Sequence, residues 1–262
     1  MTTGKTIPID YQIGNTKASV QMFIDKLTEI QKSRIKTVNI DMSVPYISAI
    51  KTNLPNAKII IDKFHLLAEL NRGIEMIKRH TLLKMKEREN RVKKGEKYNP
   101  HREQIINKDF RLFNQRETNA LRWAVVKRPT HLNAYQSQVL KKLEKWNMPL
   151  YKAYLLKEQF YALLIPQPKE IAQVNIRLWM EEARKTKLAG LTCFCKTLDA
   201  HFPYVLNYFE YRTTSGGIEG ANNKIKTIKR MGYGYRNLDY FFRKIRSRFF
   251  HLPKLYTLFT YT

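Results

Sequence analysis

The order strand, helix, strand over residues 34–62 constrains the fold of this chain more than any other feature. Residues 34–41 have the β-branched and apolar positions of a strand, and residues 57–62 contain three consecutive isoleucines that predict a second strand buried on both faces. Residues 45–53 predict a short helix between them, which Ser43 is placed to cap. This order is typical of the βαβ unit, which joins parallel strands through a crossover helix. We therefore expect an α/β fold.

The rest of the chain is expected to be predominantly helical. Apolar residues at three-four spacing predict one helix over 16–31 and another that begins at Phe64 and continues into a basic stretch. Residues 213–217 predict a glycine-rich loop, and residues 5–13 and 123–126 are expected to be extended. Further helices are expected at 102–120, 134–146, 149–164, 168–187, 199–210, 218–230 and 238–250.

A large excess of positive charge indicates a polyanionic partner. The 262 residues include 48 Lys and Arg against 22 Asp and Glu, a formal net charge of +26 at pH 7. Such an excess creates a potential of several kT at the surface, and each phosphate that a cation neutralises releases counterions and favours binding. The alternative is a merely soluble basic protein, but solubility rarely needs so large an excess. The hydrophobic content of 43% excludes a wholly disordered chain.

Cysteine spacing and hydropathy predict the compartment. Cys193 and Cys195 are separated by one residue, which is too close for an ordinary disulfide, and the chain has no second pair for a zinc cluster. We expect both to be reduced thiols. No apolar run reaches the length of a membrane span, and the N-terminus lacks the pattern of a signal peptide. We expect a cytoplasmic protein without a membrane partner.

Two aspartates at the ends of the expected strands form the first candidate site. Asp41 and Asp62 would lie at the edge of a parallel sheet where α/β folds bind ligands, on strands roughly 5 Å apart. Two carboxylates there can share divalent cations and act on a phosphodiester. The alternative is that each aspartate caps the following turn or helix. His65 is open to a metal or phosphate role, or it is an ordinary surface histidine.

The second candidate site begins after the glycine-rich loop. Glu219 lies in the first turn of the expected helix, where the helix dipole keeps its carboxylate ionised and available to a metal ion. Asn223, Lys226 and Arg230 share its face at helical spacing, and a strip of this composition suits a metal ion beside a phosphate backbone. An ordinary solvated helix is the alternative.

A basic segment rich in tyrosine and glycine follows this helix. Its interleaved cations and aromatic rings are suited to gripping a sugar-phosphate backbone and stacking on bases, without distinguishing DNA from RNA. The residues expected to contact nucleic acid are Lys224, Lys226, Lys229, Arg230, Tyr233, Tyr235 and Arg236. Further basic residues at 243–248 continue the same character.

Together these segments resemble a known family, the DDE transposases of bacterial insertion sequences of the ISL3 type. The order and spacing of the shared motifs match over about residues 15–250. The motifs are DMS at 41–43, YISA at 46–49, LPNAK at 54–58, DKFH at 62–65, AYLLKE at 153–158, GIEGANNKIK at 217–226, KR at 229–230 and GYGYRN at 232–237. The ordered set is more specific than any single motif.

The resemblance implies an incomplete RNase H-like core, around residues 34–62, with a large all-helical insertion. Residues 1–66 would form the partial core and residues 67–212 the insertion. Residues 213–262 would supply the C-terminal core helices, which hold the third catalytic acid and a basic segment that contacts DNA. The expected fold class is therefore α/β, with mostly helical content.

The resemblance also implies an activity. Asp41 would be the second catalytic acid and Glu219 the third, both as ligands of Mg²⁺ or Mn²⁺, and Asp62, His65 and Asn223 would line the site. The reaction would be strand cleavage at transposon ends, followed by attack of the freed 3′-hydroxyl on target DNA. The partners would be DNA and other copies of the chain, in the bacterial cytoplasm at the nucleoid.

One departure from the family pattern affects this expectation. The family's first catalytic aspartate lies on a strand well upstream of the segment that matches Asp41, and the surroundings of Asp10, the nearest acid, do not resemble it. Zinc-binding and helix-turn-helix regions are not recognised either. We therefore expect the C-terminal part of a transposase, truncated and catalytically incomplete, and leave open whether it is an enzyme. The alternatives are a non-enzymatic nucleic-acid-binding protein derived from a transposase and an RNase H-like nuclease acting on RNA or hybrids.

Overall fold

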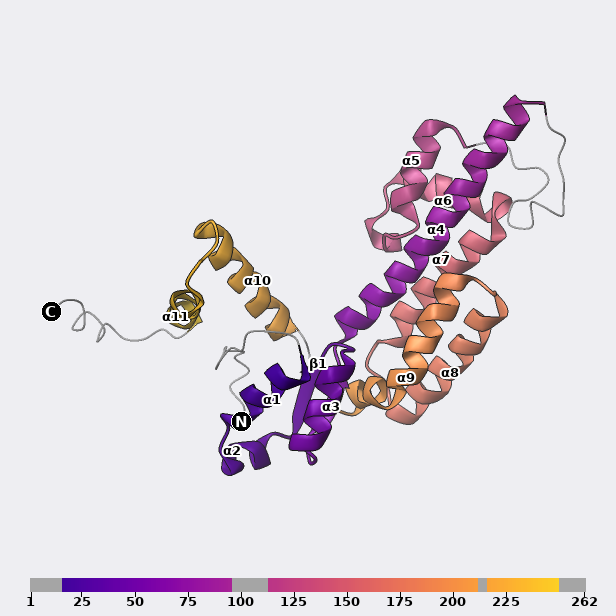
Figure 1. The fold of residues 1–262 in the computed structure, drawn as a ribbon. Coiled ribbons are helices and arrows are strands. Elements are labelled where there is room, and N and C mark those ends of the chain that lie inside the picture. The colour runs from indigo at the N-terminus through magenta and orange to yellow at the C-terminus, as the bar shows by residue number, and fades with distance from the viewer. Residues whose placement is uncertain (1–15, 96–112, 212–215, 250–262) are drawn as a thin grey trace. The chain divides into compact units, whose positions relative to one another are not determined.

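The computed structural model describes residues 16–95, 113–211 and 216–249, which are predominantly helical (Figure 1). The chain divides into two compact units. Unit 1 comprises Met1–Ile59 and Thr213–Thr262, and unit 2 comprises Ile60–Arg212. The extended segment expected at residues 5–13 lies outside the described residues.

Two short helices replace the single helix expected over 16–31. Helix α1 (Lys17–Asp25) is followed by α2 (Glu29–Arg34). The break falls at Thr28, whose hydroxyl accepts the backbone N–H of Gln31 (3.2 Å) while the Gln31 side chain accepts the backbone N–H of Thr28 (2.9 Å). This capping box satisfies free N–H groups at the start of a new helix. The apolar spacing continues across the break between the two helices, so the spacing alone predicts one helix.

The predicted βαβ unit is confirmed. Strand β1 (Thr37–Ile40), helix α3 (Val44–Asn53) and strand β2 (Lys58–Ile61) follow in order, and the strands are parallel neighbours in a two-stranded sheet of the described residues. The backbone N–H of Lys58 donates to the carbonyl of Lys36 (2.9 Å), which aligns the starts of the two strands. The three isoleucines of β2 are buried, as predicted, and β1 is half-buried throughout.

Helices α1 and α3 pack against each other in unit 1. The buried apolar side chains of the two helices include Ile24, Ile47 and Ile50. The side-chain amide of Gln21 donates to the side-chain oxygen of Asn53 (2.9 Å), so a polar bond also joins the two helices. The crossover helix is thereby fixed on one side by a second helix.

Unit 2 is built from helices in the described residues. They are α4 (Lys63–Lys93), α5 (Gln115–Ala124), the 3₁₀ turn η1 (Pro129–His131), α6 (Ala134–Trp146), α7 (Met148–Leu163), α8 (Lys169–Lys185) and α9 (Ala189–Tyr211). Helices α6, α7 and α8 confirm the prediction. The expected extended link at 123–126 is wrong, because Trp123 and Ala124 form the last turn of α5 and the next two residues form a turn that begins with helical backbone at Val125. The helix expected at 199–210 begins ten residues earlier and continues through Pro203.

Packing in unit 2 centres on α9 and α7. Helix α4 packs along α9 and α7, and α8 packs against the same two helices (Figure 1). The aromatic rings of Phe160, Trp179 and Phe194 come from α7, α8 and α9, with centroids 4.7–5.8 Å apart. Where α4 crosses α9, Gly73 faces Gly190, and a Cβ added to Gly73 would lie 2.6 Å from the Gly190 carbonyl oxygen. Only glycine permits this approach.

The last two helices belong to unit 1 and pack against each other. Helix α10 (Gly216–Met231) confirms the helix predicted at 218–230 but begins two residues earlier, so the end of the expected glycine-rich loop is helical. Residues 213–215 of that loop lie outside the described residues. Helix α11 (Leu238–Phe249) confirms the last predicted helix. Among the side chains of these helices that the structure describes, Ile228 and Ile245 are buried. We call residues 216–249 the α10–α11 hairpin. In the part of the chain that the structure describes, no helix is long and apolar enough to cross a membrane.

Candidate functional site

Asp41 lies directly after β1, half-buried at the start of the turn into α3. Its Oδ1 accepts the backbone N–H of Ser43 (3.0 Å), which is the hydrogen bond of an Asx turn. Ser43 occupies the N-cap position of α3, as expected, but makes no side-chain cap bond. One carboxylate oxygen of Asp41 therefore orders the turn, and the other has no hydrogen bond among the described residues.

Asp62 occupies the equivalent position after β2. Its Oδ1 accepts the backbone N–H of Phe64 (3.0 Å), and its carbonyl accepts the N–H of Leu66 (3.1 Å), so Asp62 begins α4. His65 lies in the first turn of α4 and is exposed. Both aspartates thus perform the capping that was the alternative to metal binding, and each does so with a single oxygen.

Strands β1 and β2 are neighbours in the sheet, and each is followed directly by one of the two aspartates. The division between the compact units falls within β2, so Asp41 belongs to unit 1 and Asp62 to unit 2. No group of three or more His, Cys, Asp and Glu that could hold a metal ion occurs among the described residues. The side chain of Glu219 lies outside them, so that search does not test the predicted set of acids.

Helix α10 places Glu219 and Asn223 as the sequence predicts, one turn apart near its N-terminus. Asn223 is exposed, and so are Lys226 and Arg230 further along the same face. Ile228, on the other side, is buried against α11. The helix therefore has one packed face and one solvent face of an amide and two cations, and neither cation forms an ion pair among the described residues.

Two of the predicted DNA-contacting residues have structural contacts. Tyr235 is half-buried with its ring stacked on Phe241 (centroids 4.8 Å apart), and a Cβ on Gly232 would lie 2.5 Å from the Tyr235 ring. Lys224 donates from Nζ to the carbonyl of Arg248 (2.5 Å), which joins α10 to the last turn of α11. The Tyr235 contacts stabilise the corner of the α10–α11 hairpin, and the Lys224 bond joins its two helices away from that corner.

The end of α10 presents Tyr233 to solvent. The N–H of Gly234 donates to the Lys229 carbonyl (3.1 Å), and the N–H of Tyr233 donates to the Arg230 carbonyl (3.0 Å). This is the Schellman pattern, whose left-handed residue is usually glycine. Here that residue is Tyr233, with φ of 49°, and its side chain is fully exposed. An exposed ring on a strained backbone is typical of a functional position.

Positive charge dominates the α10–α11 hairpin. Between residues 220 and 249 the sequence has nine Lys and Arg and a single acid, Asp239. The exposed cations are Lys224, Lys226, Lys229, Arg230, Arg236, Arg243, Lys244, Arg246 and Arg248. A helical pair with this charge density is suited to a phosphate backbone.

Sequence reasoning missed a buried polar network in unit 2. Lys157 is completely buried, and its Nζ donates to the carbonyls of Val125 (3.1 Å) and Lys127 (2.8 Å) and pairs with Glu158 Oε1 (2.8 Å). Burial lowers the pKa of this lysine. The available signal was the position of Lys157 at helical spacing from the apolar residues Ala153, Tyr154 and Phe160, in a motif that had been quoted only for its family resemblance.

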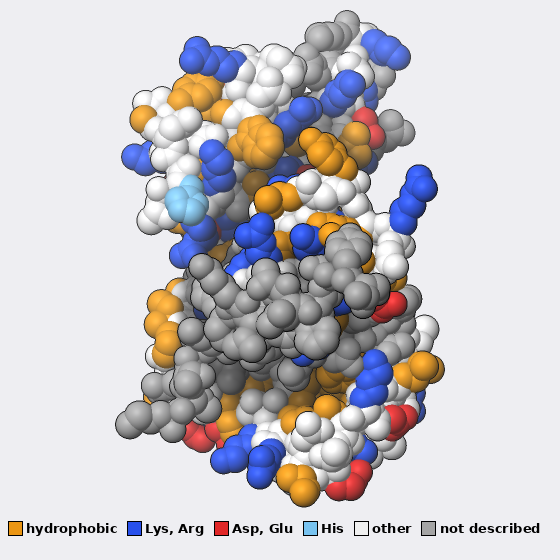
Figure 2. Space-filling model, turned by 90° about the vertical axis from the view of Figure 1, so that its left-hand side faces the viewer, with side chains coloured by type: hydrophobic (Ala, Val, Ile, Leu, Met, Phe, Trp, Pro, Cys, Tyr) orange, Lys and Arg blue, Asp and Glu red, His pale blue; other side chains and the backbone are white. Residues whose placement is uncertain are grey.

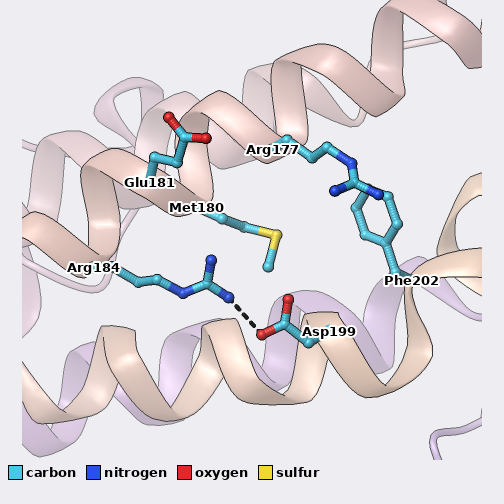
Figure 3. Close-up of a pocket in the computed structure, with 6 residues that line it drawn as sticks. All are labelled: Arg177, Met180, Glu181, Arg184, Asp199 and Phe202. Carbon is cyan, nitrogen blue, oxygen red and sulfur yellow. Dashed lines mark hydrogen bonds and ion pairs between the residues drawn. The ribbon is translucent and has the colours of Figure 1, made fainter.

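A small pocket between α8 and α9 has compensated charges. It measures about 190 Å³ (Figure 3). Arg184 pairs with Asp199 (2.5 Å), and the guanidinium of Arg177 lies 4.9 Å from the centre of the Phe202 ring. Because both guanidinium groups are engaged, the pocket is not a candidate anion site.

The two cysteines of α9 are free thiols, as predicted. Cys193 is exposed, and Cys195 is buried, which raises the pKa of its thiol to about 11. Neither thiol is part of the candidate site.

Comparison with known proteins gives the family. The model of ISL3-type DDE transposases, described as a transposase, matches residues 2–245 of the chain. The chain belongs to this family. Among curated proteins, the transposase for insertion sequence element IS1001 of Bordetella parapertussis is 29% identical over 236 residues, which are 90% of this chain and 53% of the relative. No solved structure matches.

A second relative agrees with this family. The transposase for insertion sequence element IS1557 of Mycobacterium tuberculosis is 23% identical over 232 residues, which are 86% of this chain and 50% of the relative. This ISL3-family chain thus spans about half the length of the curated relatives that it matches.

Proposed function

We propose that this chain acts on DNA as a DDE transposase, in metal-dependent strand cleavage and strand transfer at the ends of an insertion sequence. Asp41 and Glu219 are the metal ligands in this proposal, and Asp62, His65 and Asn223 line the site on an RNase H-like core. The observation that carries the proposal is the position of Asp41, directly after a strand with a parallel neighbour, in a chain of this family. The carboxyl edge of such a sheet is where α/β folds bind ligands.

The donor atoms fit a hard divalent cation. One carboxylate oxygen of Asp41 holds the Asx turn, and the other has no hydrogen bond to any residue that the structure describes, so the backbone positions this possible ligand atom. Carboxylate oxygens are preferred by Mg²⁺ and Mn²⁺. Bound there, the metal would polarise a phosphodiester and stabilise its leaving oxygen.

The α10–α11 hairpin supplies the electrostatic part of DNA binding. Lys226, Lys229 and Arg230 are exposed and have no acidic partner among the described residues, so no ion pair must break when they meet phosphate. Each phosphate that they neutralise releases counterions and strengthens binding at low salt. Tyr233, exposed at the end of α10, adds a ring that can stack on a base.

Cleavage is tested with the full chain, Mg²⁺ and a supercoiled plasmid that carries insertion-sequence ends. If a further acid such as Asp10 completes the catalytic set, we expect nicking that requires the metal and disappears in Asp41→Asn and in Glu219→Gln. Asn at position 41 keeps an oxygen for the Ser43 N–H, so the turn should persist. Asp25→Asn, an exposed acid on α1, is the control and should nick normally. Nicking that survives both substitutions at positions 41 and 219 would contradict the assignment of these acids.

The second candidate function is non-enzymatic binding of nucleic acid through the α10–α11 hairpin. The nine cations of that hairpin favour it independently of any acid. It predicts salt-dependent DNA binding, unchanged by Glu219→Gln, and no nicking under any metal condition. Binding measured by anisotropy at several salt concentrations, beside the plasmid assay, decides between the two functions.

A further inference from the structure

A cavity between α4 and α5 in unit 2 is lined by none of the candidate site residues. It measures about 530 Å³, within the range of small-ligand sites. Glu75 and Lys78 line it from α4, and Asn119, Arg122 and Trp123 line it from α5. Hydrophobic side chains lie among Lys and Arg over the upper part of the face drawn in Figure 2, where Figure 1 places α5.

Trp123 is the most unusual member of this lining. Its side chain is 62% exposed, although a ring of this size usually packs in a core or an interface. No hydrogen bond or ring contact involves its indole among the described residues. The ring is therefore available to a planar ligand, and burying it would release much apolar surface from water.

Two buried lysines hold the backbone that presents this ring. Lys78 donates from Nζ to the carbonyl of Arg122 (2.9 Å), and Lys157 donates to the carbonyls of Val125 and Lys127. Lys78 comes from α4 and Lys157 from α7, so the C-terminal end of α5 is fixed from two sides. These bonds satisfy carbonyls that a helix end leaves free. Burying a charged group costs free energy. The two buried ammonium groups therefore indicate that the position of this end of α5 is important.

The charged groups of the cavity suit a phosphodiester beside a base. Arg122 is exposed and has no ion pair among the described residues, whereas Lys78 and Arg79 both pair with Glu75. Asn119 offers an amide that can donate to or accept from a base edge. An aromatic face, a free guanidinium and an amide are the groups that bind an unstacked nucleotide.

We propose that this cavity binds an unpaired nucleotide of single-stranded DNA, with the base stacked on Trp123 and the adjacent phosphate held by Arg122. A base within a duplex cannot reach the indole because both of its faces are already stacked. The inference rests on the proposed function in that DNA is taken as the substrate. The inference adds to the proposed function a binding site for single-stranded DNA in unit 2.

The test is fluorescence anisotropy of the full chain with a fluorescein-labelled oligothymidylate and, separately, with a labelled duplex of equal length. We expect Trp123→Ala to weaken oligothymidylate binding by about tenfold and Trp123→Phe to retain most of it. Duplex binding should not change in either variant. Leu178→Ala, which truncates a side chain of similar exposure on α8, is the control and should bind normally.

Two variants that each remove one positive charge extend the test. Arg122→Gln should weaken oligothymidylate binding by about threefold, whereas Lys196→Gln, an exposed cation on α9, should have a smaller effect. Far-UV circular dichroism of each variant confirms folding, which removal of a mostly exposed ring should leave intact. Quenching of tryptophan fluorescence by oligothymidylate should be lost in Trp123→Phe.

The outcomes separate this inference from the proposed function. Equal weakening of single-strand and duplex binding by Trp123→Ala, or no weakening of either, would overturn the nucleotide site. If duplex binding through the α10–α11 hairpin persists in that case, the proposed function stands. If the wild-type chain binds neither oligonucleotide, the proposed function fails as well.

Discussion

Unit 2 and the α10–α11 hairpin use the same element, the α-helix, for different ends. In unit 2 the helices bury large side chains from several directions, as in the ring cluster of Phe160, Trp179 and Phe194. In the hairpin, two helices pack on each other with Ile228 and Ile245 as their buried side chains. Apolar burial at about 25 cal/mol per Å² therefore stabilises unit 2 far more than the hairpin.

The two regions also differ in charge, because most acids of unit 2 form ion pairs whereas the hairpin has a large excess of cations. The acids of unit 2 are largely engaged, as Glu75, Glu117, Glu158 and Asp199 each form an ion pair. In the hairpin, nine cations have two acids among them, Glu219 and Asp239. Repulsion between these cations weakens the hairpin by itself and is relieved when phosphate neutralises them. We infer that unit 2 is organised for stability and the hairpin for binding.

The largest expected effect is loss of the ring cluster. Phe160→Ala should lower the free energy of unfolding by about 3–5 kcal/mol, because it removes a buried ring and its two aromatic neighbours' contacts. All three tryptophans of the chain lie in unit 2, so urea unfolding followed by tryptophan fluorescence reports that unit. Leu155→Ala, on the exposed side of α7, should cost less than about 1 kcal/mol. Equal losses in the two variants would contradict the comparison.

Two glycine substitutions should show the same difference in packing between unit 2 and the hairpin, with smaller changes in stability. Gly73→Ala places a Cβ 2.6 Å from the backbone oxygen of Gly190, so α4 and α9 must separate, at a cost of about 1–3 kcal/mol in the same urea experiment. Gly220→Ala in α10 meets nothing within 4 Å. It should raise helix stability by about 0.5–1 kcal/mol, visible as slower amide exchange in α10, and leave the tryptophan transition unchanged. A stable Gly73→Ala variant would show that the helix crossing is loose.

Much of the helical framework could be predicted from sequence because its boundaries are local. Proline and glycine positions and a regular apolar spacing define α6, α8 and α10. The continuation of α9 through Pro203 could not be predicted in this way, since burial of its apolar face outweighs the hydrogen bond that proline removes. The burial of Lys157 was missed because a lysine in an apolar pattern is normally assigned to the surface.

The local surroundings of two candidate site residues could be predicted from the sequence, whereas their assembly into a site could not. A strand followed by aspartate is a local pattern, and Asp41 and Asp62 do end neighbouring strands. Their hydrogen bonds to Ser43 and Phe64 follow from the same local chemistry. The approach of Glu219 to either acid depends on contacts between segments far apart in sequence, which spacing does not encode, and it stays a proposal.

Removing hairpin charge should affect binding without affecting the stability of unit 2. The double variant Lys226→Gln, Arg230→Gln should weaken duplex binding by about tenfold at low salt and reduce the slope of log affinity against log salt by about 2. Its tryptophan-monitored unfolding should match the wild type. The control removes two exposed cations of unit 2, Lys152→Gln and Lys196→Gln, and should change the slope less. A matching loss of slope in the control would assign DNA binding to net charge alone.

Tyr233 tests whether the hairpin sacrifices stability for exposure of a ring. With φ of 49°, it occupies the position that glycine prefers, so Tyr233→Gly should stabilise the end of α10 by about 0.5–1 kcal/mol. Amide exchange near the end of α10 should slow, and binding to DNA should weaken because the ring is lost. Tyr233→Asn, which tolerates the same backbone without the flexibility of glycine, also removes the ring and should weaken DNA binding in the same way. Tighter binding in both variants would mean that the ring hinders DNA.

The smallest effect on stability is expected at the two thiols. Their reactivity measures how accessible the interior of unit 2 is to a reagent, without a change to a buried side chain. Exposed Cys193 should react with a disulfide reagent at pH 8, whereas Cys195 should not, because its burial raises the pKa to about 11 and only the thiolate is nucleophilic. Cys193→Ser should change stability by less than about 0.5 kcal/mol and remove the native reaction entirely, while unfolding in urea restores one reactive thiol. Since the folded pKa lies above the unfolded value, the Cys195 thiol favours the folded state below pH 9, and this contribution is lost as the pH rises through 11. Reaction of Cys195 at pH 8 in the native protein would show that the helices of unit 2 open readily, and the contrast with the hairpin would then be one of charge alone.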